Sequence, residues 1–284
     1  MKEIQVLMST YNGEKYLKEQ LDSIFKQIDV KVHLLVRDDG SKDETLKILK
    51  QYDDIEVVTG KNEGPTKSFL DLIELAGDYD YYAFADQDDV WDNNKLFVAI
   101  SMLLELEGPA VYSSDARIVD ENLKFIKKET KSPVVTLGSA IVKNYVTGCT
   151  AVFNRELMVK LKKYKPNHAP FHDWWINLVC LSIGGKSIFD NTPHISYRQH
   201  GNNVVSGNAT FIKKWSSRLK KFRKKPYGRD KMAQEIIEKY ADNISSENYR
   251  ILNAMKNKKY IREMRTGNIV DDLLFAICLI FRKV

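Results

Sequence analysis

Residues 83–91 read Ala-Phe-Ala-Asp-Gln-Asp-Asp-Val-Trp, so an apolar run stops at three carboxylates within four positions. The aromatic residues just before it favour a buried strand that ends at Asp86. Packed carboxylates repel one another, and a divalent cation with oxygen ligands relieves that repulsion. The stretch therefore predicts either a metal site that holds a diphosphate at a strand end, or an acidic turn that caps a helix beginning near Asn93.

Strands and helices are predicted to alternate through the first hundred residues. The strands are expected at 4–8, 30–36, 55–58 and 81–85, and the helices at 14–27 (with Asn12 as N-cap), from 41 and at 68–76. The helix from 41 is marked by a capping box, Ser41 with Glu44 three residues later. This order indicates an α/β fold whose mostly parallel sheet is flanked by helices. Ligands bind beyond the carboxyl ends of such strands, so the polar loops should share one rim.

Composition describes a globular chain with one unusual segment. The 284 residues carry a net charge of +6, and residues 213–225 contain eight Lys or Arg and no acid. That asymmetry points to an anionic partner such as a membrane surface, a nucleic acid or an acidic substrate. The three cysteines have no paired or metal-like spacing, which suggests a reducing compartment. The N-terminus has no signal-peptide layout, and the longest apolar run, 273–281, is about half of a membrane-spanning length.

Three segments in this order resemble a known family. Residues 8–13 (Met-Ser-Thr-Tyr-Asn-Gly), 38–43 (Asp-Asp-Gly-Ser-Lys-Asp) and 86–89 together resemble the nucleotide-sugar half of the family 2 glycosyltransferases. The resemblance implies the Rossmann-like GT-A fold. It also implies a catalytic domain at 1–207, with a nucleotide-sugar half at 1–108 and an acceptor half at 109–207, and a basic helical region at 208–284. No G-x-G-x-x-G follows the first strand, which argues against a dinucleotide oxidoreductase.

The resemblance also implies a donor site. Asp38 would accept the N3–H of a uracil or thymine base, and Thr10 and Tyr11 would line the base and ribose. Asp88 would bind a Mg²⁺ or Mn²⁺ ion that bridges the two phosphates. The remaining expected donor or metal residues are Asn12, Asp39, Lys67, Asp86, Arg198 and His200. Taken alone, Asp38 and Asp39 could instead be charges favoured at a helix start.

A second chemical centre is expected at residues 171–175, Phe-His-Asp-Trp-Trp. The resemblance implies that Asp173 is the general base that takes the acceptor hydroxyl proton in an inverting transfer; the alternative is a carboxylate that caps the helix after it. His172 stands where the family usually has a carboxylate. With Trp174 and Gly148 it completes the expected acceptor residues, although the tryptophan could also simply pack.

Residues 195–203, Ile-Ser-Tyr-Arg-Gln-His-Gly-Asn-Asn, are similar to a rhamnosyltransferase-like subgroup of this family. That similarity implies dTDP-L-rhamnose as donor and a lipid-linked or polysaccharide acceptor, with a UDP-hexose donor as the alternative. Alternatives of another class are a non-catalytic nucleotide-binding module and a basic membrane or nucleic-acid adaptor.

Beyond residue 207, Phe211, Trp215, Leu219 and Phe222 recur at helical spacing among the lysines and arginines. Such a helix suits an anionic membrane surface, and a solvated basic face packed on the catalytic domain is the alternative. We expect membrane contact through 213–225 at the cytoplasmic face of a bacterial membrane and no nucleic-acid partner, since no binding module accompanies the basic stretch. Further helices are expected at 232–240, 247–264 and 271–281.

Overall fold

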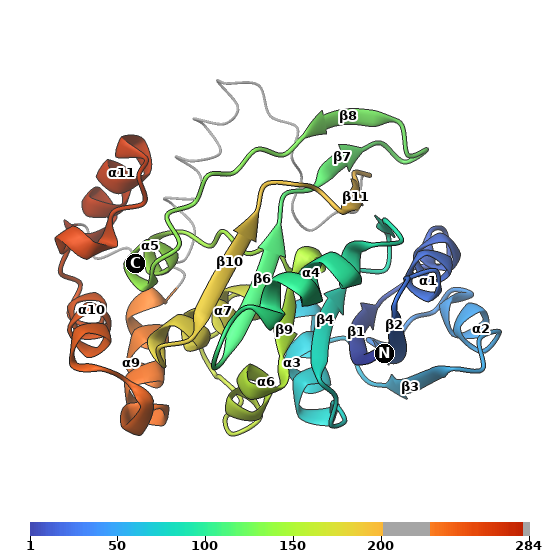
Figure 1. Cartoon of the computed structure of the whole chain (residues 1–284), viewed down its shortest axis with the longest axis horizontal. Coiled ribbons are helices and arrows are strands. Elements are labelled where there is room, and N and C mark those ends of the chain that lie inside the picture. The colour runs from blue at the N-terminus through green and yellow to red at the C-terminus, as the bar shows by residue number, and fades with distance from the viewer. Residues whose placement is uncertain (201–227, 281–284) are drawn as a thin grey trace.

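The computed structural model describes residues 1–200 and 228–280. Its main sheet contains seven described strands in the order β10-β6-β9-β4-β1-β2-β3, shown in Figure 1. All neighbouring pairs are parallel except those of β9, which runs antiparallel to β4 and β6. The strands are β1 (Lys2–Thr10), β2 (Val30–Asp38), β3 (Ile55–Thr59), β4 (Tyr81–Ala85), β6 (Ala110–Ser114), β9 (Val152–Asn154) and β10 (Lys186–Asp190). The expected α/β class with a mostly parallel sheet is confirmed.

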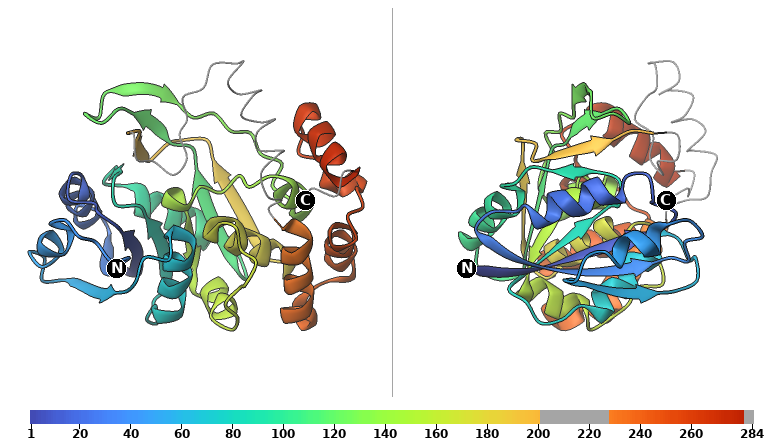
Figure 2. Two further views of the ribbon diagram at one scale, coloured as in Figure 1. Left: turned by 180° about the vertical axis from the view of Figure 1, so that it is seen from behind. Right: turned by 90° about the vertical axis from the view of Figure 1, so that its right-hand side faces the viewer.

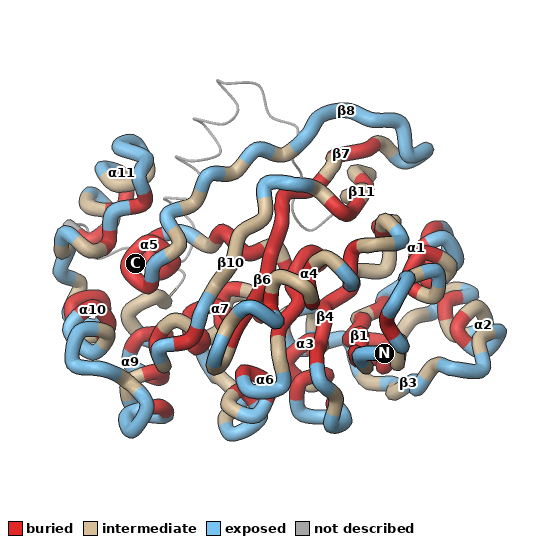
Figure 3. The backbone as a smooth tube through the Cα atoms, in the orientation of Figure 1, coloured by how far each residue is buried: buried red, intermediate tan, exposed pale blue. Residues whose placement is uncertain are grey.

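Helices cover both faces of this sheet (Figure 2). Side chains alternate along β1, so Ile4, Val6 and Met8 join one buried cluster while Leu7 joins the other. The first cluster is completed by α1 (Leu17–Phe25), α2 (Thr45–Leu49) and α4 (Lys95–Leu104). The second is completed by α3 (Pro65–Leu75), α5 (Leu137–Val142), α6 (Arg155–Leu161) and α7 (His172–Ser182). Figure 3 shows the buried residues concentrated along the sheet and the helix faces turned toward it.

A smaller sheet stands at the carboxyl edge of the main one. Its described strands are β5 (Val90–Trp91), β11 (Ile195–Arg198), β7 (Arg117–Val119) and β8 (Phe125–Lys128), in that order. β8 pairs antiparallel with β7, and its four residues are exposed. Through β5 and β11, this sheet joins the chain just after the acidic stretch to residue 198.

Two helices begin later in the chain than expected, for the same physical reason. The first helix begins at Leu17 and not at 14, and α2 begins at Thr45 and not at 41. Ser41 donates its hydroxyl to Asp38 and accepts from the Asn12 N–H, so it does not cap a helix. The loops after β1 and β2 use their polar side chains to bind each other, and that competes with helix capping.

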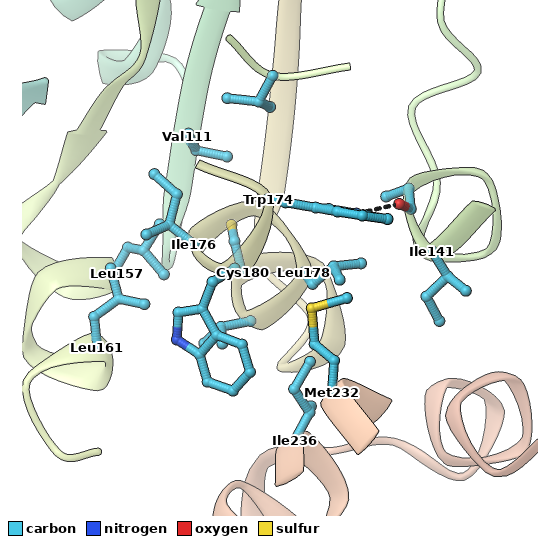
Figure 4. Close-up of a cluster of buried hydrophobic side chains, with 14 of the residues drawn as sticks. Val111, Ile141, Leu157, Leu161, Trp174, Ile176, Leu178, Cys180, Met232 and Ile236 are labelled. Carbon is cyan, nitrogen blue, oxygen red and sulfur yellow. Dashed lines mark hydrogen bonds between the residues drawn. The ribbon is translucent and has the colours of Figure 1, made fainter. Parts of the chain in front are cut away.

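The described C-terminal helices pack into the same core as the helices that cover the sheet. They are α9 (Arg229–Lys239), α10 (Ser246–Lys256) and α11 (Ile269–Ile280), with short 3₁₀ turns between them. Met232 and Ile236 of α9 lie against α7, next to Leu178, as Figure 4 shows. Residues expected to continue the second of these helices to 264 leave it at Lys256. The part of the chain after 228 is therefore an integral layer of the fold.

Candidate active site

The loops that follow β1, β2 and β4 meet at the carboxyl edge of the main sheet (Figure 1). β1 pairs in parallel with both neighbours, with Thr10 opposite Asp38 and Met8 opposite Ala85. Because parallel strands bring their carboxyl ends to one edge, residues 10–12, 38–41 and 86–89 share a rim, as the sequence predicted.

Asn12 fastens the first loop to the second. Its N–H donates to Ser41 Oγ at 2.9 Å, and the Lys42 N–H donates to Asn12 Oδ1 at 2.9 Å. Asn12 has φ 47°, a left-handed conformation that asparagine tolerates better than most residues. The neighbouring Tyr11 side chain is 43% exposed on this edge. Asn12 thus shapes the rim, and Tyr11 offers a ring to a ligand.

Asp38 is 1% exposed and is satisfied by groups of the rim itself. Its Oδ1 accepts from Thr10 Oγ1 at 3.0 Å and from Ser41 Oγ at 2.5 Å. Its Oδ2 accepts from the N–H groups of Gly40 at 3.2 Å and Ser41 at 2.8 Å. Four bonds match the acceptor capacity of a carboxylate. This occupancy argues against the expected bond from Asp38 to a base N3–H and favours a role in shaping the loop.

Asp39 connects the same loop to the start of α3. It accepts from Arg37 Nη1 at 2.5 Å and from the N–H of Gly64 at 2.9 Å. Arg37 also meets Asp71 of α3 at 2.8 Å. Lys67, expected to bind the donor, lies on the first turn of α3 with an exposed side chain and pairs with Glu63 at 3.3 Å. Asp39 therefore anchors the loop after β2 to the start of α3, while Lys67 lies exposed at the surface in an ion pair with Glu63.

Gln87 is a rim residue that the sequence analysis did not single out. Its Oε1 accepts from the Tyr11 N–H at 2.8 Å, and its Nε2 donates to the Tyr11 carbonyl at 3.0 Å. A Cβ on Gly13 would lie 2.3 Å from Gln87 Oε1, so only glycine leaves room for this clamp. In the sequence, Gln87 is marked only by its place as an amide between acids. Its role could not be predicted there because its partner, Tyr11, lies 76 residues away.

The acidic stretch meets the segment after β11. Asp88 Oδ2 lies 2.8 Å from His200 Nε2, which brings together two predicted metal ligands that are 112 residues apart. Burial, together with the charges of Asp88 and Asp173, raises the pKa of Asp86 to about 7. Asp89 is fully buried and accepts from the Arg198 N–H at 3.1 Å. Its other oxygen has no hydrogen-bond partner among the described residues.

A buried layer lies beneath these acids. Ligand atoms of Asp86, Asp89 and Cys149 lie within 4.8 Å of one another. Burial raises the pKa of the Cys149 thiol well above its ordinary value, which fits the predicted role of a small buried residue. Lys95 is a second residue whose role the sequence did not predict. It is 1% exposed, and its Nζ lies 3.6 Å from the centre of the Trp91 ring. Burial lowers the pKa of Lys95 to about 7, so the ammonium group behind the acids loses its proton more easily than an exposed lysine does.

The side-chain types on the rim suit a hard divalent cation. Asp88 and His200 place a carboxylate oxygen and an imidazole nitrogen in contact, and Asp86 lies close enough for the charge of Asp88 to raise its pKa. The ligand atoms of Asp86 themselves lie near those of Asp89 and Cys149. A cation there would relieve the repulsion that raises the pKa of Asp86, and the unpartnered oxygen of Asp89 adds acceptor capacity nearby. Carboxylate and imidazole ligands suit Mn²⁺, and carboxylates with phosphate oxygens suit Mg²⁺.

Asp173 begins α7 at the neighbouring part of the rim. It accepts from the N–H groups of Trp174 at 2.6 Å and Gly148 at 2.9 Å and from Asn144 Nδ2 at 3.0 Å. These bonds favour the charged form, but burial outweighs them and raises the pKa of Asp173 to about 6. A carboxylate held in place near neutral pKa is the form that a general base takes.

Of the other expected acceptor residues, His172 and Gly148 lie against each other, whereas Trp174 is packed in the interior. His172 is 9% exposed and stacks on Phe69 with ring centres 4.0 Å apart; burial lowers its pKa to about 3, so the ring is neutral. A Cβ on Gly148 would lie 2.7 Å from His172 Nε2, so glycine is required for this approach. Trp174 is 2% exposed and donates its indole N–H to the Ala140 carbonyl at 2.6 Å (Figure 4). Its burial supports the packing alternative and argues against an acceptor contact.

Arg198 was expected to pair with the diphosphate, but the structure buries it to 1% exposure. Its Nε donates to the Asp88 carbonyl at 2.9 Å and its Nη1 to the Glu121 carbonyl at 2.5 Å. It also forms an ion pair with Glu19 of α1. The guanidinium therefore ties three segments of the rim together, and this placement argues against direct diphosphate contact.

Known proteins resemble this chain in sequence. The family model described as glycosyl transferase family 2 matches residues 5–163. The dTDP-rhamnosyl transferase RfbG of Shigella flexneri is 30% identical over 94% of this chain and 92% of its own length. The Escherichia coli enzyme named UDP-Glc:alpha-D-GlcNAc-diphosphoundecaprenol beta-1,3-glucosyltransferase WfgD is 29% identical over 55% of this chain and 61% of its own length.

Solved structures share the fold. The structure of Staphylococcus aureus TarS with UDP-GlcNAc superposes with a TM-score of 0.61 and covers 90% of this chain and 72% of that chain. The two sequences are 20% identical, so the likeness speaks for the architecture alone. Together with the family match, it identifies the sheet and its flanking helices as GT-A-like.

Proposed function

Because the chain belongs to glycosyltransferase family 2, we propose that it is an inverting, metal-dependent transferase of bacterial cell-surface glycan synthesis. One observation carries the proposal: the Asp88–His200 contact and the Asp173 carboxylate lie on one rim. The charge of Asp173 reaches Asp86 there and helps raise its pKa. The non-catalytic alternative would not require carboxylates to be held together against their repulsion.

In the proposed reaction, the ionised Asp173 takes the proton of an acceptor hydroxyl. The hydroxyl oxygen attacks the anomeric carbon from the face opposite the diphosphate, and the bond from that carbon to the phosphate oxygen breaks. Trp174 N–H, Gly148 N–H and Asn144 keep the base oriented for this step. A divalent cation held by Asp86, Asp88 and His200 would supply neutralisation of the leaving diphosphate.

For the donor we propose dTDP-L-rhamnose, supported by the pattern at 195–203 and by the relative named as a dTDP-rhamnosyl transferase. A UDP-hexose is the second candidate, because WfgD is named for UDP-Glc and uracil shares the N3–H of thymine. Both nucleotides would enter through the rim formed by Thr10, Tyr11 and Asn12.

The donor assignment is tested by a panel of nucleotide sugars. Hydrolysis and thermal shift are measured with Mn²⁺ and with Mg²⁺, using dTDP-rhamnose, UDP-glucose, UDP-GlcNAc and a GDP-sugar as the control. We expect the largest shift with dTDP-rhamnose and little with the guanine nucleotide. A response to UDP-hexoses only would replace the donor, and no response to any UDP- or dTDP-sugar would remove the proposed function.

For the acceptor we propose a lipid-linked oligosaccharide or polysaccharide at the cytoplasmic face of the membrane. None of the helices in residues 1–200 and 228–280 is long and apolar enough to cross a bilayer. The basic stretch 213–225 lies outside the described residues, and its composition supports contact with anionic lipid headgroups. Sedimentation of the full chain with phosphatidylglycerol vesicles, compared with a variant in which four of these lysines are serine, tests that contact; equal binding would exclude it.

A further inference from the structure

We infer that Tyr16 is a positioning residue whose ring holds His200 against Asp88. The inference rests on the proposed metal site and concerns how the chain builds it. Tyr16 lies just before α1, is 8% exposed and belongs to the loop that follows β1. Because the ring is buried, it is not available to stack on a nucleoside base.

The Tyr16 ring contacts two side chains from the segment at the end of β11. The Arg198 Cζ lies 4.5 Å from the ring centre, and the His200 ring centre lies 5.0 Å from it with the planes tilted by 35°. These separations are those of a cation–π contact and of an aromatic pair. The imidazole that contacts Tyr16 is the one whose Nε2 lies 2.8 Å from Asp88 Oδ2.

Arg198 makes this contact rigid. It is 1% exposed, donates to the carbonyls of Asp88 and Glu121, and pairs with Glu19. The same guanidinium therefore fixes the backbone of Asp88 and the face on which Tyr16 rests. Tyr16 in turn fixes the ring of His200, so the two ligand groups are positioned through one connected set of contacts.

The ring, and not the hydroxyl, carries this role. Tyr16 Oη reaches Glu121 Oε2 only at 3.5 Å, the outer limit of a hydrogen bond. Phenylalanine should therefore retain the function, while a residue without a ring should lose it. A histidine left to rotate must be ordered when metal binds, and that cost lowers metal affinity.

The experiment measures Mn²⁺ binding to the full chain without any nucleotide, by the electron paramagnetic resonance signal of free Mn²⁺. We expect Tyr16→Leu to weaken binding about 3- to 10-fold, the equivalent of one aromatic contact, and Tyr16→Phe to bind as the wild type does. Tyr16→Met keeps the side-chain bulk and is measured alongside, in case the leucine variant does not fold. Tyr52→Leu is the matched control: that ring stacks on Phe25 at the other end of α1, with centres 5.7 Å apart, and its loss should leave Mn²⁺ affinity unchanged.

A double-mutant cycle identifies the route. In the His200→Ala background, Tyr16→Leu should have no further effect, because the residue it positions is gone. Wild-type affinity in folded Tyr16→Leu and Tyr16→Met, or a loss that persists without His200, would overturn the inference. If the wild type itself binds no Mn²⁺, the metal site falls and the inference with it, a result distinct from unchanged affinity in the variants.

Discussion

Replacing Asp173 with asparagine should abolish activity and stabilise the protein at the same time. The isosteric amide removes the negative charge that burial makes costly. The pKa of Asp173 is raised from 3.8 to about 6, and each unit is worth about 1.4 kcal/mol, so full relief would be about 3 kcal/mol. Part of the side chain remains open to solvent, which reduces the relief to roughly 2 kcal/mol. The amide NH2 cannot accept from the Gly148 N–H, and that lost hydrogen bond costs about 1 kcal/mol. We therefore expect a net gain of roughly 1 kcal/mol at pH 8, a rise of a few degrees in Tm.

The sign follows from proton linkage. The folded protein binds the Asp173 proton more tightly than the unfolded chain, so wild-type stability falls as pH rises from about 4 through about 6. The advantage of Asp173→Asn should therefore be complete at pH 8, and near pH 4 the variant should be slightly less stable than the wild type because only the lost Gly148 hydrogen bond remains. A carboxylate that merely capped α7 would behave oppositely, because its ionised form would stabilise the helix and asparagine would weaken it.

The assay is thermal or urea unfolding at several pH values, paired with turnover of the nucleotide sugar that responds in the donor panel. Asp22→Asn is the control: its pKa is lowered, chiefly by the hydrogen bond from Tyr52, so this variant should lose stability at neutral pH and approach wild type as pH falls. Turnover should fall by at least about 100-fold in Asp173→Asn only. Destabilisation of that variant at pH 8, or unchanged turnover, would refute the reasoning.

Three further predictions concern packing around the site. Met232→Ala should lower the free energy of unfolding by about 2–5 kcal/mol in urea titrations, because Met232 is 1% exposed against α7; a loss below 1 kcal/mol would mean that α9 is not part of the core. Gly13→Ala should reduce donor affinity in calorimetry, because its Cβ would displace Gln87 from Tyr11, and unchanged affinity would rule out the clamp. Lys95→Met should raise Tm because it removes a buried cation without a hydrogen-bond partner in the described chain, and a lower Tm would show that the acids beneath the rim need its charge.

The alternation of strands and helices and the shared rim could be predicted from the sequence because both depend on local patterns. Short, nearly continuous apolar runs predict β1, β2 and β4, and parallel pairing then brings the loops after them together. Asp88 and His200 were both expected among the donor or metal residues, and their shared role as metal ligands stays a prediction. Their contact could not be read from local patterns, since 112 residues separate the two positions.

The failures share a cause that local patterns do not contain. Ser41 and Glu44 have the spacing of a capping box, but Ser41 bonds to Asp38 and Asn12, and the Glu44 N–H bonds to Glu14 Oε2. The same dependence on distant partners applies to Arg198 and Trp174, whose types suit diphosphate and sugar. Both make internal hydrogen bonds in the structure, and their ligand roles stay predictions. Which polar side chain remains available to a ligand depends on partners supplied by distant loops.

The region after 228 bears on the proposed chemistry, because α9 contacts both segments that position Asp173, the proposed base. Glu235 is 6% exposed and accepts from the N–H groups of Asn167 and His168, each at 3.0 Å, in the loop that leads into α7. Arg229 donates to the carbonyls of Ile141 and Val142, each at 3.1 Å, just before the segment that bears Asn144.

One segment leads to Asp173, and the other carries its hydrogen-bond donor Asn144. A chain cut after residue 207 would lose these anchors and expose the apolar face of α7, so its failure to bind vesicles would say nothing about the basic stretch. Charge substitutions within 213–225 leave α9 in place, and they separate lipid contact from support of the base.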